Sequence, residues 1–272
     1  LFHGLEGSSR SHYAEAFADV AREQGLAYVV PHFRGCSGDI NLAPRAYHSG
    51  DHEELDWILR RLAAEHPQRR LLAVGVSLGG NALLRWAAEQ GEAANRVVAA
   101  VAGVCAPLDL AAGGHAIGRG LNRQIYNRMF MRTLVPKALA KWAQHPGLFD
   151  RERLLAARDL YTFDNVFTAP LHGFRDTEDY WARASAKPRL GEVRVPALVL
   201  NARNDPFVPA NSLPGPQGRG SHVTLWQPAH GGHVGFPARE AGMGLRGHVR
   251  AMPVAVTRWL RQLGKEPETS HG

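Results

Sequence analysis

Cysteine is nearly absent from this sequence, which has only Cys36 and Cys105 among 272 residues. Two cysteines cannot form a disulfide framework, and their spacing matches no zinc-binding motif. Long apolar runs are absent too: the longest, Val97–Ala106, spans about ten residues, whereas a membrane-spanning helix needs roughly 20. These absences exclude a disulfide-rich protein and a membrane-spanning one. The scarcity of cysteine suits a reduced compartment, and we expect a cytoplasmic protein.

The composition provides ample material for a folded core. Hydrophobic residues make up 44% of the chain and charged residues 21%, which is typical of a globular domain and excludes disorder, collagen and coiled coil. The sequence contains no internal repeat and no low-complexity segment. The length predicts one domain with insertions, or two small domains.

The net charge of +7 is distributed unevenly along the chain. Residues 1–110 carry a net charge of −3, residues 111–194 carry +6 and residues 195–272 carry +4. A basic segment attracts anions such as phospholipid head groups or nucleic acid. A solvated, arginine-rich surface explains the same numbers. We expect no nucleic-acid partner, and we keep a weak contact between the basic segment and anionic membranes as a hypothesis.

Short apolar runs alternate with amphipathic stretches, a pattern that predicts an α/β fold with a mainly parallel sheet flanked by helices. The runs that predict buried strands are Leu26–His32, Leu71–Val76, Val97–Cys105, Ala197–Ala202 and Val223–Gln227. The stretches that predict helices around this sheet are Ser11–Gln24, Asp51–His66, Leu78–Gln90 and Val254–Leu263.

The alternation stops over residues 111–194. This segment predicts helices near Leu121–Thr133, Pro136–Gln144 and Arg151–Asp159, and it contains no strong strand pattern. A helical insertion between two strands of a parallel sheet is a natural lid over an active site. We therefore expect a core made of residues 1–110 and 195–263, a lid made of residues 111–194, and a flexible tail over residues 264–272.

One motif points directly to catalysis. Gly75-Val76-Ser77-Leu78-Gly79 matches G-x-S-x-G and lies between an apolar run and a helix-forming stretch. A strand, a sharp turn and a helix are what a nucleophile elbow requires, because the turn lifts the serine hydroxyl above the sheet. Glycine is needed two residues before and two residues after the serine, where bulk would block the turn. A glycine-rich βα turn of a nucleotide-binding fold is the alternative interpretation.

A serine nucleophile needs a base and an acid that orients the base. Asp205 follows the predicted strand Ala197–Ala202, and His233 lies in a glycine-rich loop after the last predicted strand. This order, serine then acid then histidine, is that of an α/β hydrolase. Asp109 is a second candidate for the acid and His230 a second candidate for the base; their sequence context is poorer.

The oxyanion formed during acyl transfer needs two N–H donors. The residue after the nucleophile, Leu78, provides one. The loop His3-Gly4-Leu5-Glu6-Gly7 is the candidate for the other, because Gly4 allows the backbone to turn the N–H of Leu5 toward the serine. A helix and then an apolar run follow this loop at the expected distance from the elbow.

Six motifs together resemble the α/β-hydrolase superfamily and, within it, the YheT-like hydrolases. They are HGLEGS (His3–Ser8), FRGCSG (Phe33–Gly38), YHSG (Tyr47–Gly50), GVSLGGN (Gly75–Asn81), NDPFVP (Asn204–Pro209) and GGHVGF (Gly231–Phe236). The resemblance runs from Leu1 to about Trp259. It implies Ser77 as nucleophile, Asp205 as acid and His233 as base, with no metal or organic cofactor. It also implies a small-molecule carboxylic ester as substrate.

The sequence departs from this family at its beginning. In the family fold, two strands precede the strand that leads into the His-Gly loop, and that strand lies in the middle of the sheet. Only Leu1-Phe2 correspond to it here. A gap in the sheet would leave buried backbone groups unpaired, at about 1–3 kcal/mol each. We therefore expect the natural protein to extend several dozen residues further at its N-terminus.

Three other groups of residues have two interpretations each. Cys36 is either a nucleophile or, as we favour, a packed loop residue. Tyr47–Gly50 either lines the pocket or caps the following helix. The pairs Phe163-Asp164 and Tyr180-Trp181 either contact an acyl chain or pack the lid helices.

The sequence thus predicts a serine esterase that acts on short- to medium-chain acyl esters through an acyl-enzyme. An alcohol acyltransferase or a lipase would use the same three residues. A catalytically silent protein that binds a small ligand is the alternative of another class. Oligomeric state is not predicted.

Overall fold

The computed structural model describes residues 1–238 and 248–263. Four strands form a parallel sheet in the order β1 (Leu72–Val76), β2 (Ala100–Val104), β3 (Ala197–Leu200) and β4 (Val223–Trp226). β1, β2 and β3, which are rich in alanine, valine and leucine, are buried almost throughout, as expected for strands covered on both faces. The prediction of an α/β fold with a parallel sheet flanked by helices is confirmed.

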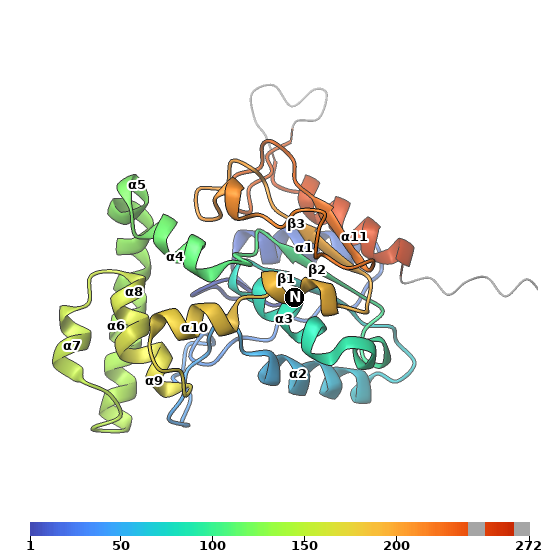
Figure 1. Ribbon diagram of the computed structural model, residues 1–272. Helices are drawn as coiled ribbons and strands as arrows, with labels where there is room; N and C mark the ends of the chain where they lie inside the picture. Colours follow the sequence, from blue (N-terminus) through green and yellow to red (C-terminus); the bar gives the residue numbers. More distant parts are fainter. Residues whose placement is uncertain (239–247, 264–272) are drawn as a thin grey trace, which may run out of the picture.

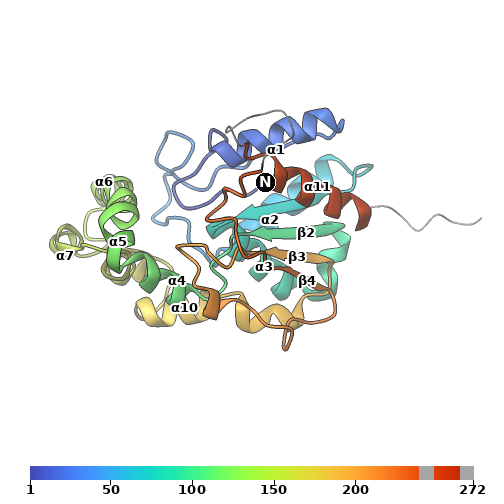
Figure 2. The ribbon, with the colours of Figure 1, turned by 90° about the horizontal axis from the view of Figure 1, so that it is seen from above.

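Helices cover both faces of the sheet (Figures 1 and 2). α1 (His12–Glu23) and α11 (Ala251–Leu263) pack together on one face. α2 (His52–Glu65) and α3 (Leu78–Gln90) lie on the other, where α3 packs directly on β1 and β2. α3 is apolar on nearly all sides because it is enclosed between the sheet and α2. A short 3₁₀ helix, η1 (Gly91–Arg96), leads from α3 toward β2.

Residues 111–194 form a group of helices beside the sheet, at the left of Figure 1. They pack around an apolar cluster of their own, which includes Leu134, Leu154 and Phe167. The helical elements between β2 and β3 are α4 (Leu110–Ile117), α5 (Gly120–Asn122), η2 (Arg123–Asn127), α6 (Arg128–Gln144), α7 (Arg151–Ala156), α8 (Leu160–Phe163), η3 (Asp164–Thr168), α9 (Ala169–Leu171), α10 (Thr177–Ala184) and η4 (Lys187–Glu192). η5 (Ala210–Ser212) lies between β3 and β4.

A buried amide joins the end of this insertion to the core. The Asn81 side chain, on α3, donates to the carbonyl oxygens of Ser49 and Ala184, at 2.8 and 2.9 Å. Its own oxygen accepts from the backbone N–H of Ala186 at 3.0 Å. All the polar atoms of this side chain are therefore used to connect α3, the loop before α2 and the last residues of the insertion.

The strand expected at Leu26–His32 is wrong. A strand needs a neighbour with which to exchange backbone hydrogen bonds, and the nearest segment, Leu1-Phe2, pairs on its other side with β1. Phe2 donates to the Val74 carbonyl at 2.7 Å and accepts from Val76 at 2.9 Å. Within the described residues, the two segments share one hydrogen bond, from the Leu1 amino group to the Val29 carbonyl at 2.7 Å.

The helix boundary expected at Pro136 is also wrong, since α6 runs through this proline. A proline inside a helix removes one backbone donor, here the one for the carbonyl of Arg132. Arg132 is exposed, so water can satisfy that carbonyl. The helix expected over Arg151–Asp159 ends earlier, at Ala156. The tail expected over residues 264–272 lies outside the described residues.

Among the described residues, no helix is both long enough and apolar enough to cross a lipid bilayer.

Candidate active site

Ser77 occupies a strained turn between β1 and α3. Its backbone φ of 54° and ψ of −119° are unfavourable for a residue with a side chain. The turn is possible because glycine stands on either side: a Cβ on Gly75 would lie 2.2 Å from the carbonyl oxygen of Gly79. A Cβ on Gly79 would lie 2.6 Å from the carbonyl oxygens of both Phe2 and His3. The close approach of strand, helix and N-terminal loop therefore holds the serine hydroxyl above the sheet.

Three side chains from distant parts of the sequence meet at this turn. The Ser77 Oγ lies 3.1 Å from the Nε2 of His233. The Nδ1 of the same ring lies 2.8 Å from the Oδ2 of Asp205. Asp205 follows β3 and His233 follows β4, so both come from the carboxyl edge of the parallel sheet. The structure thus brings the serine, acid and histidine selected from the sequence into one hydrogen-bonded row.

Neighbouring groups fix the acid and the histidine. The other carboxylate oxygen of Asp205 accepts from the Phe207 N–H at 2.8 Å, and the Phe207 ring lies against the imidazole of His233, at 4.3 Å between centroids. The side-chain oxygen of Asn204 accepts from the N–H groups of Gly231 and Gly232, both at 2.9 Å. Sequence reasoning missed Asn204, although its place directly before the proposed acid was a usable signal.

The two alternative candidates lie outside this row. The Asp109 carboxylate accepts from the Ala112 N–H at 3.1 Å and caps α4, and its second oxygen lies 3.4 Å from Lys187. His230 is exposed to solvent. Asp109 therefore has a structural role at a helix terminus.

The loop that contains Leu5 lies against the serine. Leu5, Ser77 and Leu78 line the same cavity, and a Cβ on Gly4 would lie 3.1 Å from the Cβ of Ser77. Leu78 is the first residue of α3, so its N–H has no acceptor within the helix. The N–H of Gly4 is already engaged, since it donates to the Tyr13 hydroxyl at 2.8 Å.

His3 holds this loop in place. Its Nε2 accepts from the Phe33 N–H at 3.1 Å, so its Nδ1 carries the proton that is donated to the Gly4 carbonyl at 2.8 Å. Burial lowers the pKa of His3 to about 4, which keeps the ring neutral near pH 7. His3 and Tyr13 were not recognised from the sequence as loop anchors, because their partners are backbone groups that only the fold brings close.

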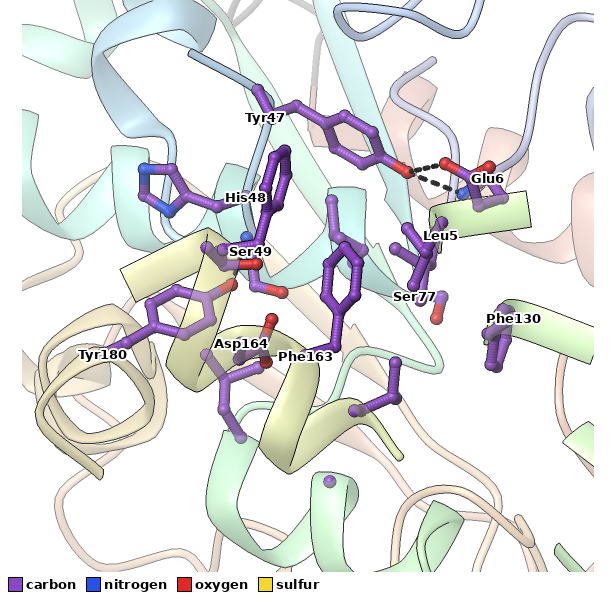
Figure 3. Close-up of a pocket in the computed structure, with 18 of the residues that line it drawn as sticks. Leu5, Glu6, Tyr47, His48, Ser49, Ser77, Phe130, Phe163, Asp164 and Tyr180 are labelled. Atoms are coloured by element: carbon purple, nitrogen blue, oxygen red, sulfur yellow. Dashed lines mark hydrogen bonds between the residues drawn. The ribbon is translucent and has the colours of Figure 1, made fainter. Parts of the chain in front are cut away.

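The cavity above Ser77 extends between the sheet edge and the insertion and has a volume of about 140 Å³. Most of its wall is apolar, including side chains of Leu110, Ile117, Phe130, Leu134, Phe167 and Phe207. Figure 3 shows Ser77 and Leu5 at one side and Phe163, Asp164 and Tyr180 facing them from the insertion. Phe163, Asp164, Tyr180 and Trp181 thus form part of the wall of this space, in addition to packing the helices.

The position of Tyr47 decides between the two interpretations of Tyr47–Gly50, as a part of the pocket lining or as a cap of the following helix. Tyr47, His48 and Ser49 line the cavity, and the cap position of α2 is taken by Asp51. The Tyr47 hydroxyl accepts from the Glu6 N–H and donates to the Glu6 carboxylate, both at 2.8 Å, as Figure 3 shows. The same carboxylate pairs with Lys137 at 2.9 Å.

Cys36 is half-buried beside this ion pair, with its Sγ 3.6 Å from the Lys137 Nζ. Burial raises the pKa of its thiol, which disfavours the thiolate that a nucleophile requires. The interpretation of Cys36 as a packed loop residue fits these contacts.

Among the described residues of the insertion, Asp164 is the one carboxyl group that lines the cavity. Its Oδ2 accepts from the Trp181 indole N–H at 2.9 Å. Enclosure by protein raises its pKa to about 6, and hydrogen bonds from Thr168 and Trp181 offset part of the rise. The surface that the side chain retains faces the cavity, so a proton or a hydrogen-bond donor of a bound molecule can reach it.

The described residues contain one group of potential metal ligands, formed by Cys105, Asp205 and His233. Their ligand atoms lie within 4.8 Å of one another. Asp205 and His233 are already bound to each other. The Sγ of Cys105 accepts from the Val234 N–H at 3.3 Å, and burial raises the pKa of this thiol. A protonated thiol and two engaged partners do not fit a metal ion.

Comparison with known proteins agrees with this architecture. A family model described as the alpha/beta hydrolase fold matches residues 1–239. The chain belongs to this family.

Individual relatives of this chain carry the names of an esterase and a phospholipase. The chain is 39% identical over 238 residues to the protein named "Putative esterase YheT" of Escherichia coli (strain K12), a match that covers 87% of this chain and 69% of the relative. It is 31% identical over 241 residues to Phospholipase ABHD3 of Mus musculus, covering 87% of this chain and 57% of that protein. The chain therefore spans little more than half the length of this second relative.

The fold is shared more widely. A solved structure of the Pyrococcus furiosus esterase Pf2001 superposes with a TM-score of 0.55 at 14% identity, covering 97% of this chain and 79% of the other. At this identity the likeness concerns the fold alone.

Proposed function

We propose that this protein hydrolyses carboxylic esters with Ser77 as the nucleophile. The observation that carries the proposal is the hydrogen-bonded row Asp205–His233–Ser77 at the base of an apolar cavity. Membership of the alpha/beta hydrolase fold family supports it. The names of the two curated relatives, an esterase and a phospholipase, support the esterase and lipase type of hydrolase.

The reaction begins with attack of the Ser77 hydroxyl on the ester carbonyl while the Nε2 of His233 takes the hydroxyl proton. Asp205 holds the imidazole through Nδ1 and stabilises its charged form. The imidazolium then gives its proton to the leaving alcohol, and an acyl-serine remains. Water attacks the acyl-serine with His233 again as base, which releases the acid and restores the hydroxyl.

We assign the two oxyanion donors to the N–H groups of Leu78 and Leu5. Leu78 stands at the N-terminus of α3, where the helix dipole favours negative charge. Leu5 follows Gly4, whose carbonyl accepts from His3 and whose N–H donates to Tyr13. Both backbone polar groups next to Leu5 are therefore fixed. A preformed pair of donors stabilises the transition state without reorganisation, and the loss of one donor typically costs about 3–4 kcal/mol.

The apolar wall of the cavity supports an acyl group as the part of the substrate that occupies it. Its modest volume of about 140 Å³ supports short- to medium-chain acyl groups. The insertion contributes Phe130, Leu134, Phe163 and Phe167 to this wall. In this proposal residues 111–194 act as the lid that the sequence analysis anticipated.

Labelling with a fluorophosphonate probe tests the nucleophile. The wild-type protein is expected to be labelled, and Ser77→Ala is expected to lose labelling and to lose at least about 10³-fold in kcat toward a nitrophenyl ester. We expect its stability to stay within about 1 kcal/mol of wild type, because relief of the strained turn offsets the lost contacts. Ser9→Ala, at an exposed site, is the matched control and should label normally.

Labelling of Ser77→Ala at the wild-type rate would refute the assignment. Absence of labelling in the wild-type protein, together with tight binding of a small ligand, would instead support the catalytically silent alternative.

The same acyl-enzyme could transfer its acyl group to an alcohol instead of water. Product analysis with added ethanol separates the two reactions, since a transferase forms the ethyl ester in preference to the free acid. The contact between the basic insertion and anionic membranes remains a separate prediction.

A further inference from the structure

The longest stretch of the chain without a carboxylate lies in the insertion. No aspartate or glutamate occurs between Asp109 and Asp150. The cations within this stretch are Arg119, Arg123, Arg128, Arg132, Lys137 and Lys141. The two lysines are turned toward the core, where Lys137 pairs with Glu6 and Lys141 donates to the carbonyl oxygen of Ala43.

The four arginines of this stretch point outward. All four are exposed to solvent. In the part of the chain that the structure describes, no carboxylate pairs with any of them. Arg123, Arg128 and Arg132 stand on the continuous helical segment of η2 and α6, whereas Arg119 precedes α5 and lines a separate hollow with Asp159 and Glu178. Three exposed positive charges without a paired carboxylate therefore lie on one helical segment.

A row of exposed aliphatic side chains runs along the same segment. Leu121, Ile125 and Met129 are 79%, 57% and 50% exposed. They follow one another at intervals of four residues along α5, η2 and the start of α6, so they lie on one face of a continuous helical segment. A row of this kind is unusual on a surface that contacts only water.

A groove beside this row combines both kinds of side chain. It lies between α6 and α7 and is lined by Arg123, Arg128, Arg132 and Arg158 together with the apolar Met131 and Leu155. Guanidinium groups bind phosphate oxygens with two donors at once. The groove therefore suits an anion that carries an apolar portion.

The opposite side of the same helix faces the substrate cavity. Phe130 and Leu134 line that cavity, whereas Met129 and Arg132 are exposed on the outside. The outer face, which we define as Leu121, Ile125 and Met129 with Arg123, Arg128 and Arg132, is thus separated from the cavity by the thickness of one helix.

We propose that this outer face docks on the surface of a lipid bilayer that contains anionic phospholipids. The aliphatic row enters the boundary between head groups and acyl chains, and the arginines contact the phosphates. A nucleic acid would satisfy the arginines but would leave the aliphatic row in water, so the combination favours lipid. The inference concerns binding and does not depend on the catalytic assignment.

Sedimentation of the full chain with lipid vesicles tests the proposal. We expect binding to phosphatidylcholine vesicles containing phosphatidylglycerol, at least tenfold weaker binding to pure phosphatidylcholine, and a loss of binding as salt increases. The triple variant Arg123→Gln, Arg128→Gln and Arg132→Gln should weaken binding about 100-fold, roughly fivefold per arginine. The triple variant Leu121→Ala, Ile125→Ala and Met129→Ala should weaken binding at least tenfold.

The matched control is the double variant Trp57→Ala and Arg61→Gln on α2. Trp57 is 63% exposed, and the Arg61 guanidinium lies 5.6 Å from its ring and pairs with Glu65 at 2.8 Å, so this site combines an exposed apolar side chain with a compensated charge, away from the insertion. This control should bind vesicles as the wild type does. Hydrolysis of a short, soluble ester should be unchanged in all outer-face variants, which also shows that they fold.

Two results would overturn the proposal. One is equal binding of anionic vesicles by the wild type and both triple variants, or no binding at all. The other is duplex DNA binding that exceeds vesicle binding and is unaffected by loss of the aliphatic row, which would indicate a nucleic-acid surface instead. Repeating the vesicle assay with Ser77→Ala keeps the result independent of catalysis.

Discussion

The sheet edge and the insertion enclose the same cavity by different physical means. At the sheet edge, backbone atoms approach one another so closely that a single methyl group on Gly75 would collide with Gly79. On the insertion side, the wall consists of side chains such as Phe163 and Leu134, which belong to a separate apolar cluster. One wall is fixed by the backbone and the other by the packing of side chains.

This difference teaches which properties of the protein tolerate change. Groups held by backbone geometry, such as Ser77 and the loop at Gly4, can be repositioned only by moving a strand or a helix. Side chains of the insertion can change in size with modest repacking. We therefore expect reactivity to depend on the sheet edge and the choice of acyl group to depend on the insertion.

The largest effect is expected from Gly75→Ala. The new Cβ would meet the Gly79 carbonyl oxygen at 2.2 Å and the Cα of Gly80 at 2.7 Å, both backbone atoms that cannot rotate away. We expect a loss of about 3 kcal/mol or more in unfolding free energy, measured by urea denaturation, together with a loss of activity.

The matched control for that variant is Gly215→Ala, at a position where an added Cβ meets nothing within 4 Å. Its stability should change by no more than about 0.5 kcal/mol. A Gly75→Ala protein as stable as this control would mean that the sheet edge is less rigid than the close contacts imply.

A smaller effect, which depends on pH, is expected from Asp164→Asn. This substitution changes the insertion side of the cavity and leaves the sheet edge as it is. The pKa of Asp164 is raised by burial from 3.8 to about 6, so the folded chain binds this proton more tightly than the unfolded chain. The stability of the wild type should therefore fall as the pH rises from about 4 to about 6 and remain lower above that range. Asp164→Asn removes this fall and should be more stable than wild type at pH 7.5, by on the order of 1–3 kcal/mol.

Asp176→Asn, also in the insertion, should behave oppositely. A hydrogen bond from the Asp179 N–H lowers the pKa of Asp176, so its charged form contributes stability that is lost as the pH falls. Its replacement should reduce stability at pH 7.5, as measured by denaturation at pH 4.5 and 7.5. Identical pH profiles for wild type and Asp164→Asn would show that the Asp164 carboxyl is well solvated.

The smallest effect is expected from Phe163→Leu, which enlarges the cavity because a smaller side chain then forms part of its wall. The row Asp205–His233–Ser77 stays in place. We expect the ratio of kcat/KM for a ten-carbon ester to that for a four-carbon ester to rise several-fold, because each accommodated methylene contributes about 1 kcal/mol. Phe149→Leu, in the same apolar cluster but away from the cavity lining, should leave this ratio unchanged.

The sequence was informative wherever a local pattern determines structure. Apolar runs located β1 to β4, and for β1, β2 and β3 the reason is that strands covered on both faces must be apolar throughout. The same approach failed at Leu26–His32, where an apolar run has no neighbouring strand within the described residues to complete its hydrogen bonds. It failed again at Pro136, where the exposed side of α6 tolerates a missing backbone donor.

The candidate site was predictable to a similar extent. Ser77, Asp205 and His233 could be selected because each follows a predicted strand, and parallel strands place their carboxyl ends together. His3 and Asn204, which hold the surrounding loops, bind backbone groups 27 to 30 residues away along the chain. Asp164 could be named but not located, since a carboxyl enclosed by a cavity has the same local sequence as an exposed one.

Contacts between the insertion and the core differ in how strongly water and salt compete with them. At one end Asn81 holds Ala184 and Ala186 through buried hydrogen bonds that water cannot easily replace. At the other, α6 contacts the core through the partly exposed ion pair of Lys137 with Glu6, for which water and salt can compete, and through the buried Lys141, which donates to the Ala43 carbonyl at 3.0 Å. Raising the ionic strength should therefore weaken the Lys137–Glu6 contact first, while the buried contacts of Asn81 and Lys141 keep the insertion in place and leave the serine turn undisturbed.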